Sequence, residues 1–459
     1  MVRRPAIAVL WVLCAGCLSK PERPADDVDA TAGDAGSADA AAGDAGSSAC
    51  DAHRAPAPLA APFAAGSFVS VQHPVARLDA DCRDDLVLIG RNGAGGAHGI
   101  FILLGRDQEF LTGYDAFLPI DEDALPLAIQ VSDFMGDASV DLLVLARTRA
   151  HEGVLLAYPG RGDGTFAAPL TRAAATGFVP TGTLEMPEPV YVLTARVGGA
   201  GRGVVFGGLE KAFTLQVDAW DTEGFRTHIP RGLPTRIGSY TQGFARVGSA
   251  AAGFDDFMAV RDDHVLWLES ENDGVWSGDL EVPFARSGRR LVTFADIDGS
   301  GTVDAASMVG NSMQLALTTY PSGTADPRVE VPFFSESPDL VDGSPDALAI
   351  LDLAGDARPE ILILDAAKPE EDSGLFVYRD VRLSGDRAMV VPAMLGHDDR
   401  KQLPGMQNRM ALGDFDGDGG IDLYPFQAGV AGEAPRCYHV QERPLTGTLC
   451  VVLCSQPSC

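Results

Sequence analysis

Short apolar runs broken by glycine, aspartate and proline recur along almost the whole sequence. Runs of this length between turn-forming residues are typical of β-strands, and the longer spacing of amphipathic helices is absent from the sequence. The runs come in groups: one precedes an acidic loop, one follows it, and a third comes a few residues later. The first members are residues 68–71, 127–131, 191–193, 291–294 and 348–351. The second members are residues 86–89, 142–145, 204–206, 257–260 and 361–364. The third members are residues 100–104, 154–158, 213–217, 264–268, 315–318, 375–378 and 438–441, and a fainter fourth run follows at 329–334 and 388–391.

The acidic loops set the period of these groups. Loop starts are recognisable at Asp79, Asp133, Arg196, Arg246, Asp296, Asp352 and Asp414. Consecutive starts are about 56 residues apart on average. Four strands recurring at such a period are the signature of a propeller blade. The pattern therefore predicts an all-β fold, a seven-bladed β-propeller of four-stranded antiparallel blades.

The last loop, residues 414–422, has the most complete acidic pattern. It places aspartate at its positions 1, 3, 5 and 9 and glycine at positions 4 and 6. Crowded oxygen atoms at this spacing suit Ca²⁺, which takes six to eight oxygen ligands, and glycine lets the backbone curl around an ion. An EF-hand is excluded because position 12 is Pro425 rather than glutamate. The alternative for any one loop is an acidic turn that aspartate and glycine cap by hydrogen bonds.

Four loops retain enough acids to hold a cation. The candidate ligands are Asp414, Asp416, Asp418 and Asp422 in the seventh loop, Asp296, Asp298, Ser300 and Asp304 in the fifth, Asp352, Asp356 and Glu360 in the sixth, and Asp133, Asp137 and Asp141 in the second. The first loop, which we start at Asp79 and which is then two residues shorter, is expected to hold no ion, like the third and fourth loops. We expect two to four structural Ca²⁺ ions that stabilise only the folded state.

These loops, together with the turn over residues 162–169, resemble the FG-GAP family of β-propellers. That family includes the head of the integrin α-chain and many bacterial surface proteins. The resemblance covers about residues 63–459 and implies a seven-bladed disc with metal loops on one face. It does not imply a function, because propellers host many functions.

The N-terminus has the pattern of an export signal over residues 1–16. Two arginines precede an apolar core over residues 6–13, which is too short to span a membrane as a mature helix. Ala15, Gly16 and Cys17 resemble a bacterial lipoprotein signal, which implies cleavage after Gly16 and lipidation of Cys17. Ordinary secretion is the alternative, because Cys14 stands where that signal usually has leucine.

Residues 17–60 are rich in alanine, aspartate, glycine, serine and proline, without periodicity. Such a segment cannot bury enough apolar surface to fold, so it is expected to be a disordered tether. The propeller would then span residues 61–459. Six cysteines remain outside the signal, and an even number in an exported chain suggests disulfides whose pairing the sequence leaves open. They are Cys50, Cys82, Cys437, Cys450, Cys454 and Cys459.

Charge and motifs narrow the function classes. The chain has 64 acidic and 35 basic residues, which argues against a nucleic-acid partner. The eight histidines are scattered singly, and nucleophile-elbow, phosphate-loop and zinc-protease motifs are absent from the sequence. Trp220 and Trp276, near turns, are candidates for a sugar-binding surface, whereas Trp267 lies in an apolar run and is expected in the core.

We therefore expect a non-enzymatic binding or adhesion module for protein or glycan, exported to the outer membrane or cell surface and touching the membrane only through its lipid anchor. The alternative is a polysaccharide-acting enzyme, a lyase or hydrolase that uses propeller-face carboxylates and calcium. A third possibility is a structural component of a larger envelope assembly.

Overall fold

The structure is a computed structural model, and it divides the chain into residues 1–36 and residues 37–459. Every described residue belongs to the second unit, so the predicted signal and tether at 1–16 and 17–60 lie outside the described residues. The described residues are 61–62, 74–92, 96–106, 113–120, 124–173, 191–198, 201–207, 212–221, 224–227, 231–232, 243–250, 254–261, 263–270, 276–283, 290–296, 303–309, 314–318, 333–334, 347–351, 360–365, 374–384, 387–394, 409–417, 419–426, 438–442 and 449–453.

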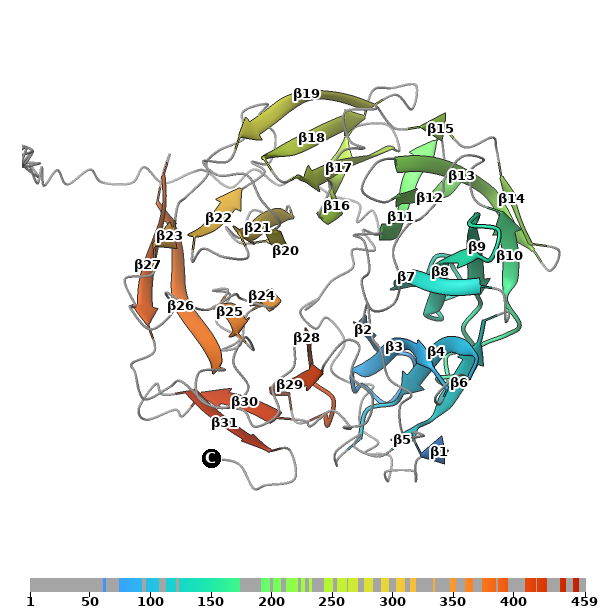
Figure 1. Ribbon diagram of the computed structural model, residues 1–459, viewed down its shortest axis with the longest axis horizontal. Coiled ribbons are helices and arrows are strands. Elements are labelled where there is room, and N and C mark those ends of the chain that lie inside the picture. The colour runs from blue at the N-terminus through green and yellow to red at the C-terminus, as the bar shows by residue number, and fades with distance from the viewer. Residues whose placement is uncertain are drawn as a thin grey trace, which may run out of the picture. The chain divides into compact units, whose positions relative to one another are not determined.

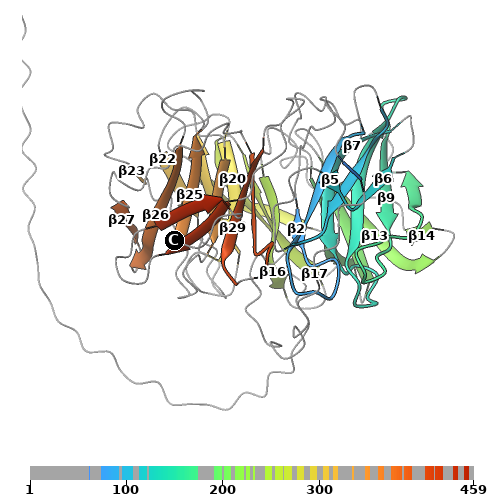
Figure 2. The same ribbon diagram turned by 90° about the horizontal axis from the view of Figure 1, so that it is seen from below.

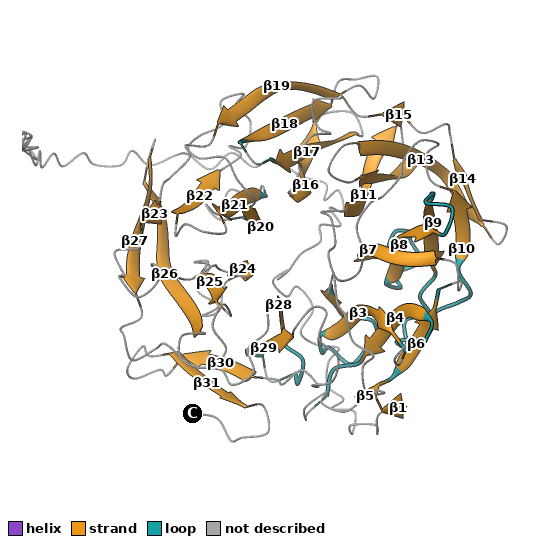
Figure 3. Cartoon of the chain, in the orientation of Figure 1, coloured by secondary structure: helices purple, strands orange, loops and turns teal. Residues whose placement is uncertain are grey.

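All regular structure in these ranges is β-strand (Figure 3). Accordingly, this part of the chain offers no helix with the length and apolar character needed to cross a membrane. Each sheet consists of strands that are close in sequence and pair antiparallel with their neighbours. The predicted apolar runs coincide with these strands wherever both are described, which confirms the all-β antiparallel fold class.

The sheets are described in chain order. The first sheet contains β2 (Val75–Ala76), β3 (Asp85–Arg91), β4 (His98–Leu103) and β6 (Ala116–Pro119), and β1 (Ala61–Pro62) pairs separately with β5 (Gly113–Tyr114). The second sheet contains β7 (Ala124–Ser132), β8 (Asp141–Thr148), β9 (Gly153–Tyr158) and β10 (Leu170–Ala173). Two later sheets contain β20 (Arg290–Ala295), β21 (Asp304–Val309), β22 (Gln314–Thr318) and β23 (Phe333–Phe334), and β24 (Ala347–Leu351), β25 (Glu360–Asp365), β26 (Gly374–Ser384) and β27 (Arg387–Met394). The last sheet contains β28 (Arg409–Gly413), β29 (Ile421–Phe426), β30 (Tyr438–Glu442) and β31 (Leu449–Leu453).

Between the second sheet and β20, the described strands form one larger sheet. Its members are β11 (Tyr191–Gly198), β12 (Gly201–Gly207), β13 (Ala212–Asp221), β14 (Gly224–Thr227), β15 (Arg231–Gly232), β16 (Gly243–Ala250), β17 (Phe254–Val260), β18 (His264–Ser270) and β19 (Trp276–Pro283). A single residue pair, Val197 with Phe254, joins its two halves through β11 and β17. Each half carries one of the two loops that have lost most of their acids, so two sequence repeats meet in this sheet.

The middle strand of each of the first two sheets is buried on both faces. Residues 86–90 of β3 and 142–146 of β8 are all buried, so side chains of both parities along the strand pack against neighbouring layers. This double burial explains why the sequence shows continuous apolar runs rather than a clean alternation. One apolar cluster fills the space between the first and second sheets, and its members include Val87, Ile102, Ile129, Val144 and Tyr158.

Consecutive sheets are in contact from the first sheet to that of β24, and the first sheet also contacts the last. β7 contacts β2 and β4, β11 contacts β7, and β20 contacts β16 and β24. β2 contacts β28, and β2 lies beside the red strands of the last sheet in both views (Figures 1 and 2). A second apolar cluster joins the first and last sheets, with Leu86, Phe101, Ala411, Phe415 and Tyr424 among its members. The two ends of the strand series therefore pack against each other.

Candidate metal centre

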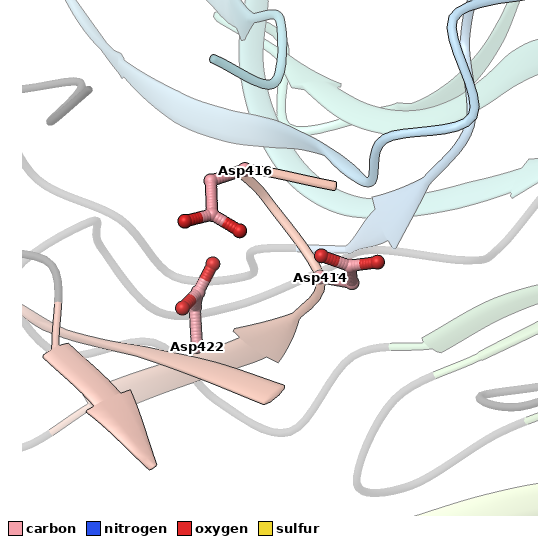
Figure 4. Close-up of side chains that lie close together, drawn as sticks. All are labelled: Asp414, Asp416 and Asp422. Carbon is pink, nitrogen blue, oxygen red and sulfur yellow. The ribbon is translucent and has the colours of Figure 1, made fainter. Parts of the chain in front are cut away.

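The acidic loop of the last sheet brings three carboxylates together. Asp414 follows β28, Asp422 is the second residue of β29, and Asp416 lies in the turn between these strands. One oxygen atom of each of the three lies within 4.8 Å of the others. Figure 4 shows the carboxylates of Asp416 and Asp422 pointing toward each other, with Asp414 beside them. The fourth predicted ligand, Asp418, lies outside the described residues.

This spacing fits a single cation. Ca²⁺–oxygen distances are about 2.3–2.6 Å, so two ligand oxygens on one ion lie at most about 5 Å apart. The backbone is curled as a metal loop requires, because Gly417 and Gly419 at positions 4 and 6 have φ angles of +80° and +82°. The pKa of Asp414 is raised to about 6, mainly by burial and also by the nearby carboxylates of Asp84 and Asp416. A bound divalent cation would compensate this crowding of negative charge.

The same carboxylates also brace the turn. Asp414 accepts hydrogen bonds from the backbone N–H of Gly417 at 2.8 Å and of Gly419 at 3.1 Å. Asp422, which is fully buried, accepts the N–H of Phe415 at 3.0 Å. The loop is thus shaped by its own backbone donors, and the remaining lone pairs of the acids are the ones available to a cation.

The aspartate at position 9 is a buried brace in three loops. Asp85, Asp141 and Asp422 all have no exposed surface. With the first loop counted from Arg77, the start that its strand pairing gives (below), each accepts the N–H of the residue at position 2 of its own loop. The distances are 2.6 Å from Leu78, 3.2 Å from Phe134 and 3.0 Å from Phe415. These bonds tie the start of each loop to its end.

Two glycines beyond the third strand complete this brace. Gly105 donates its N–H to Asp85 at 2.7 Å, and Gly160 donates its N–H to Asp141 at 2.8 Å. Sequence reasoning missed both glycines and the role of Asp85. A usable signal was present, since Gly105 and Gly160 are each followed by arginine at the end of the third apolar run of their repeats.

The first loop begins at Arg77, so our start at Asp79 was wrong and the loop has full length. Asp85 pairs with Ala76, just as Asp141 pairs with Ser132 and Asp422 with Gly413. Position 6 of the realigned loop is Cys82, whose φ of +67° matches Ala138 at +70° and Gly419 at +82°. We had placed the start at the first aspartate of this stretch, whereas the loop begins with arginine, as the third and fourth loops do. Arg77 instead forms an ion pair with Asp84 over 3.4 Å.

The second loop has the geometry of a capped acidic turn. Asp133 accepts the backbone N–H of Gly136 at 2.6 Å, of Asp137 at 3.2 Å and of Ala138 at 3.1 Å. The exposed Asp137 accepts the N–H of Ser139 at 2.9 Å. Within the described structure, Asp133, Asp137 and Asp141 are not drawn together into a ligand group as the acids of the last loop are. A metal ion in this loop stays a prediction.

The fifth and sixth loops are described only at their edges. Asp304 and Glu360, both buried, begin β21 and β25 and pair with Ala295 and Leu351, which is the register of position 9 elsewhere. Asp296 is exposed at the end of β20. The other candidate ligands of these loops lie outside the described residues: Asp298, Ser300, Asp352 and Asp356.

Other candidate residues are placed as follows. Trp267 is 1% exposed, which confirms the expectation that it belongs to the core, while Trp220 and Trp276 lie in β13 and β19. Cys82 is disulfide-bonded, and Cys450 lies in β31. The pairing, which the sequence left open, stays open. The other candidate cysteines and the lipidation candidate lie outside the described residues: Cys50, Cys437, Cys454, Cys459 and Cys17.

The buried acids give the fold a defined pH dependence in the absence of metal. Burial raises the pKa of Asp85 to about 8 and that of Asp141 to about 6, against 3.8 for the ordinary group. Such a group holds its proton more tightly in the folded chain than in the unfolded chain, so its protonation stabilises the fold. This contribution to the free energy of unfolding is complete at low pH and is lost as the pH rises through the pKa of the folded state. We therefore expect the metal-free full chain to lose stability between about pH 4 and pH 8.

Calcium should oppose this trend, because only ionised carboxylates bind it. Melting temperatures of the metal-free chain, measured across this pH range with and without added Ca²⁺, test both parts. Asp85→Asn should reduce the fall in melting temperature near pH 8 in the absence of metal, because the titrating group is gone. A metal-free stability that rises with pH over this range would contradict the prediction.

Comparison with known proteins adds the fold class. No protein-family model matches the sequence, and no curated protein matches it. Among solved structures, BBS1N in complex with ARL6DN aligns with a TM-score of 0.50 and 11% identity, covering 82% of this chain and 93% of that one. A lectin from Agrocybe aegerita that recognises non-reducing terminal N-acetylglucosamine aligns with a TM-score of 0.43 and 11% identity, covering 68% and 77%. A rhamnogalacturonan lyase from Bacillus licheniformis aligns with a TM-score of 0.40 and 12% identity, covering 86% and 74%.

BBS1N is a β-propeller, and this chain has a β-propeller fold. At these identities the similarity concerns the fold alone. The last two alignments, with TM-scores below 0.5, carry no argument about this chain.

Proposed function

We propose that this chain is a calcium-stabilised β-propeller of the FG-GAP type, exported as a lipoprotein, that acts as a non-enzymatic binding or adhesion module for protein or glycan at the cell surface. The observation that carries the proposal is the set of three carboxylate oxygens within 4.8 Å in the last loop. Asp414, Asp416 and Asp422 would hold the ion, with Asp418 as a further ligand from the sequence. The ion would supply positive charge and a rigid bridge across the turn.

The proposed architecture has seven blades, one for each acidic loop. Five of the described sheets have four strands each, in the order of the chain. The nine-stranded sheet supplies the two remaining blades if its halves are separated at the single pair Val197 and Phe254. In five loops the residue at position 9 has the same register with the strand before the loop, which supports one repeated unit.

The non-enzymatic part of the proposal rests on how the acids are used. Asp85 and Asp141 are fully buried, and each accepts N–H donors from two different loops. A carboxylate held in this way braces the backbone and does not face a substrate. The position-9 acids of the first two repeats therefore favour a structural role over a catalytic one.

Calcium binding is tested by metal counting and melting of the full chain. We expect two to four bound ions and a melting temperature several degrees higher in Ca²⁺ than in EGTA, because each ion at a hundred times its Kd adds about 2.7 kcal/mol to the folded state. Asp416→Asn should remove one ion and part of the calcium-dependent shift, since an amide is a weaker ligand. Its metal-free melting temperature should match that of the unmodified chain. Equal shifts for both chains would contradict the assignment of Asp416 as a ligand.

The binding role is tested by screening the full chain on glycan arrays and on immobilised cell-surface proteins, in Ca²⁺ and in EGTA. We expect calcium-dependent binding without turnover of the bound glycan. Cleavage products from acidic polysaccharides, lost in EGTA or in the Asp416→Asn chain, would overturn the non-enzymatic proposal and favour the lyase or hydrolase alternative.

A further inference from the structure

The contact between the first and last sheets forms a seam, which we define as Arg83, Asp84 and residues 104–106 on one side and residues 413–417 on the other. Two backbone hydrogen bonds cross it: the N–H of Asp84 donates to the carbonyl of Asp414 at 2.8 Å, and the N–H of Arg106 donates to the carbonyl of Phe415 at 2.7 Å. Among the described strands, none is shared between these two sheets.

The bond from Arg106 to Phe415 has a counterpart at the contact between another pair of sheets. At the contact of the first and second sheets, Gly164 donates its N–H to the carbonyl of Leu78 at 3.1 Å. Leu78 occupies position 2 of its loop, as Phe415 does in the last loop. The seam therefore uses the same carbonyl as the neighbouring junction, and the contact made by Asp84 is an addition to it.

The Asp84 side chain holds the backbone of the first cation ligand. Its Oδ2 atom accepts the backbone N–H of Asp414 at 2.8 Å, while its own N–H donates to the Asp414 carbonyl. Both polar groups of the Asp414 backbone are thus bound to one residue of the first sheet. Asp84 stands at position 8 of its loop, where the second and last loops have Val140 and Ile421, so those loops cannot make this contact.

The approach of the two sheets is close at the same place. A Cβ atom at Gly413 would lie 3.0 Å from Asp84 Oδ2 and 3.1 Å from Asp84 Cβ. A Cβ atom at Gly417 would lie 3.1 Å from both Cγ and Nε of Arg83. Real Cβ atoms rarely lie so near their neighbours, and glycine at both positions lets the cation loop settle directly on Arg83 and Asp84.

We propose that Asp84 is a positioning residue for the cation loop of the last sheet: its carboxylate fixes the Asp414 backbone across the seam, so the first repeat completes the metal site of the seventh. The inference rests on the proposed calcium binding. It follows that calcium bound at this loop strengthens the packing of the first sheet against the last, because the ligand that holds the ion is also the residue that holds the seam.

A positioning role and a purely electrostatic role of Asp84 predict different effects of substitution. If Asp84 acts only through its charge, it attracts the cation almost independently of the exact position of its oxygens. If Asp84 positions the loop, an acceptor atom must lie within hydrogen-bond distance of the Asp414 N–H. Arg77 lies 3.4 Å from Asp84 Oδ1 and offsets part of that charge, although its own side chain is more than half exposed. Asp84→Asn keeps an acceptor oxygen and removes the charge, while Asp84→Glu keeps the charge and moves the oxygens outward by one methylene group.

The test is hydrogen exchange of the full chain during a Ca²⁺ titration, read on peptides that cover residues 409–426. Positioning predicts that Asp84→Glu raises the calcium concentration needed for half-maximal protection by about tenfold, the usual worth of a charged hydrogen bond, and that Asp84→Asn changes it less than about threefold. Peptides over residues 124–158, away from the seam, should respond alike in all chains. Asp263→Asn, which removes an exposed charge in another repeat, should match the unmodified chain.

The outcomes separate the two proposals. A larger loss in Asp84→Asn than in Asp84→Glu would overturn positioning in favour of charge, and equal behaviour of both variants and the unmodified chain would overturn any role for Asp84. Absence of calcium-induced protection and of bound metal in the unmodified chain would overturn the proposed calcium binding, and the inference with it.

Discussion

Asp141→Ala is expected to destabilise the full chain by about 3–5 kcal/mol in metal-free buffer. The Asp141 carboxylate has no exposed surface and accepts backbone N–H groups from Phe134 at 3.2 Å, Met135 at 3.0 Å and Gly160 at 2.8 Å. Alanine leaves these donors without their acceptor, and each buried unpaired donor costs about 1–3 kcal/mol. The variant also no longer bears the cost of burying the carboxyl group, which offsets part of this loss of stability. The expected net loss is therefore smaller than the full cost of three unpaired donors.

Urea unfolding of the metal-free chain measures this loss, and Asp137→Ala is the matched control. Asp137 belongs to the same loop and also accepts one backbone N–H, but its side chain is exposed, so we expect a loss below about 1 kcal/mol. Asp85→Ala should resemble Asp141→Ala, because Asp85 is equally buried and holds two backbone donors. A loss in Asp141→Ala no larger than that in Asp137→Ala would contradict the brace.

The acidic residues of a loop have two roles, buried acceptor of backbone hydrogen bonds and candidate cation ligand, and the sequence does not distinguish them. Aspartates at positions 1, 3, 5 and 9 look equivalent as oxygen donors, and the sequence analysis treated all of them as candidate ligands. The structure places position 9 inside the sheet, where it binds a backbone donor at the start of its own loop and, in the first two repeats, a glycine beyond the third strand. It leaves Asp137 and Asp296 exposed. The difference comes from register, because position 9 is the first paired residue of the second strand or lies next to it.

The strands themselves could be predicted because their central members are buried on both faces. Residues 86–89 and 142–145 read as continuous apolar runs for that reason, and both lie inside the strands β3 and β8. The start of the first loop could not be predicted from acids alone. Arg77 occupies the place of an aspartate, and the pairing of Asp85 with Ala76 identifies it.

Contacts between sheets were beyond the sequence argument for a different reason. Asp84 and Asp414 are 330 residues apart, and nothing local to either one marks the other as its partner. The joining of β11 to β17 through Val197 and Phe254 is likewise a matter of how two sheets approach each other. Repeats predict what each unit looks like, whereas the junctions depend on individual side chains that differ between units.

Gly160→Ala is expected to cost about 3 kcal/mol, the upper end of the usual range for overpacking, although it adds only one methyl group. A Cβ atom at Gly160 would lie 2.0 Å from the carbonyl oxygen and 2.9 Å from the carbonyl carbon of Val140. Both are backbone atoms at the base of the second acidic loop, so they cannot rotate away as a side chain does. Relief requires moving the backbone of Gly160, which would also strain its hydrogen bond to Asp141.

Gly162→Ala is the control for Gly160→Ala, because it lies in the same turn and tests backbone conformation without the clash. Gly162 has a φ of +71°, and the nearest atom to an added Cβ is Ser139 Oγ at 3.6 Å. We expect a loss of about 1 kcal/mol, the usual cost of a left-handed residue other than glycine. Urea unfolding of both variants measures the difference, and equal losses would contradict the steric explanation.

Gly105→Ala extends this prediction to the seam. Gly105 has the same role as Gly160, but an added Cβ would lie 2.8 Å from the carbonyl oxygens of both Asp84 and Phe415. The same methyl group should therefore destabilise the first sheet and also increase hydrogen exchange in residues 409–426, at the other end of the chain. Gly160→Ala should leave that segment unchanged. If both variants increased hydrogen exchange in residues 409–426 equally, the effect would reflect general destabilisation. That result would contradict a specific contact between the first and last sheets at the seam.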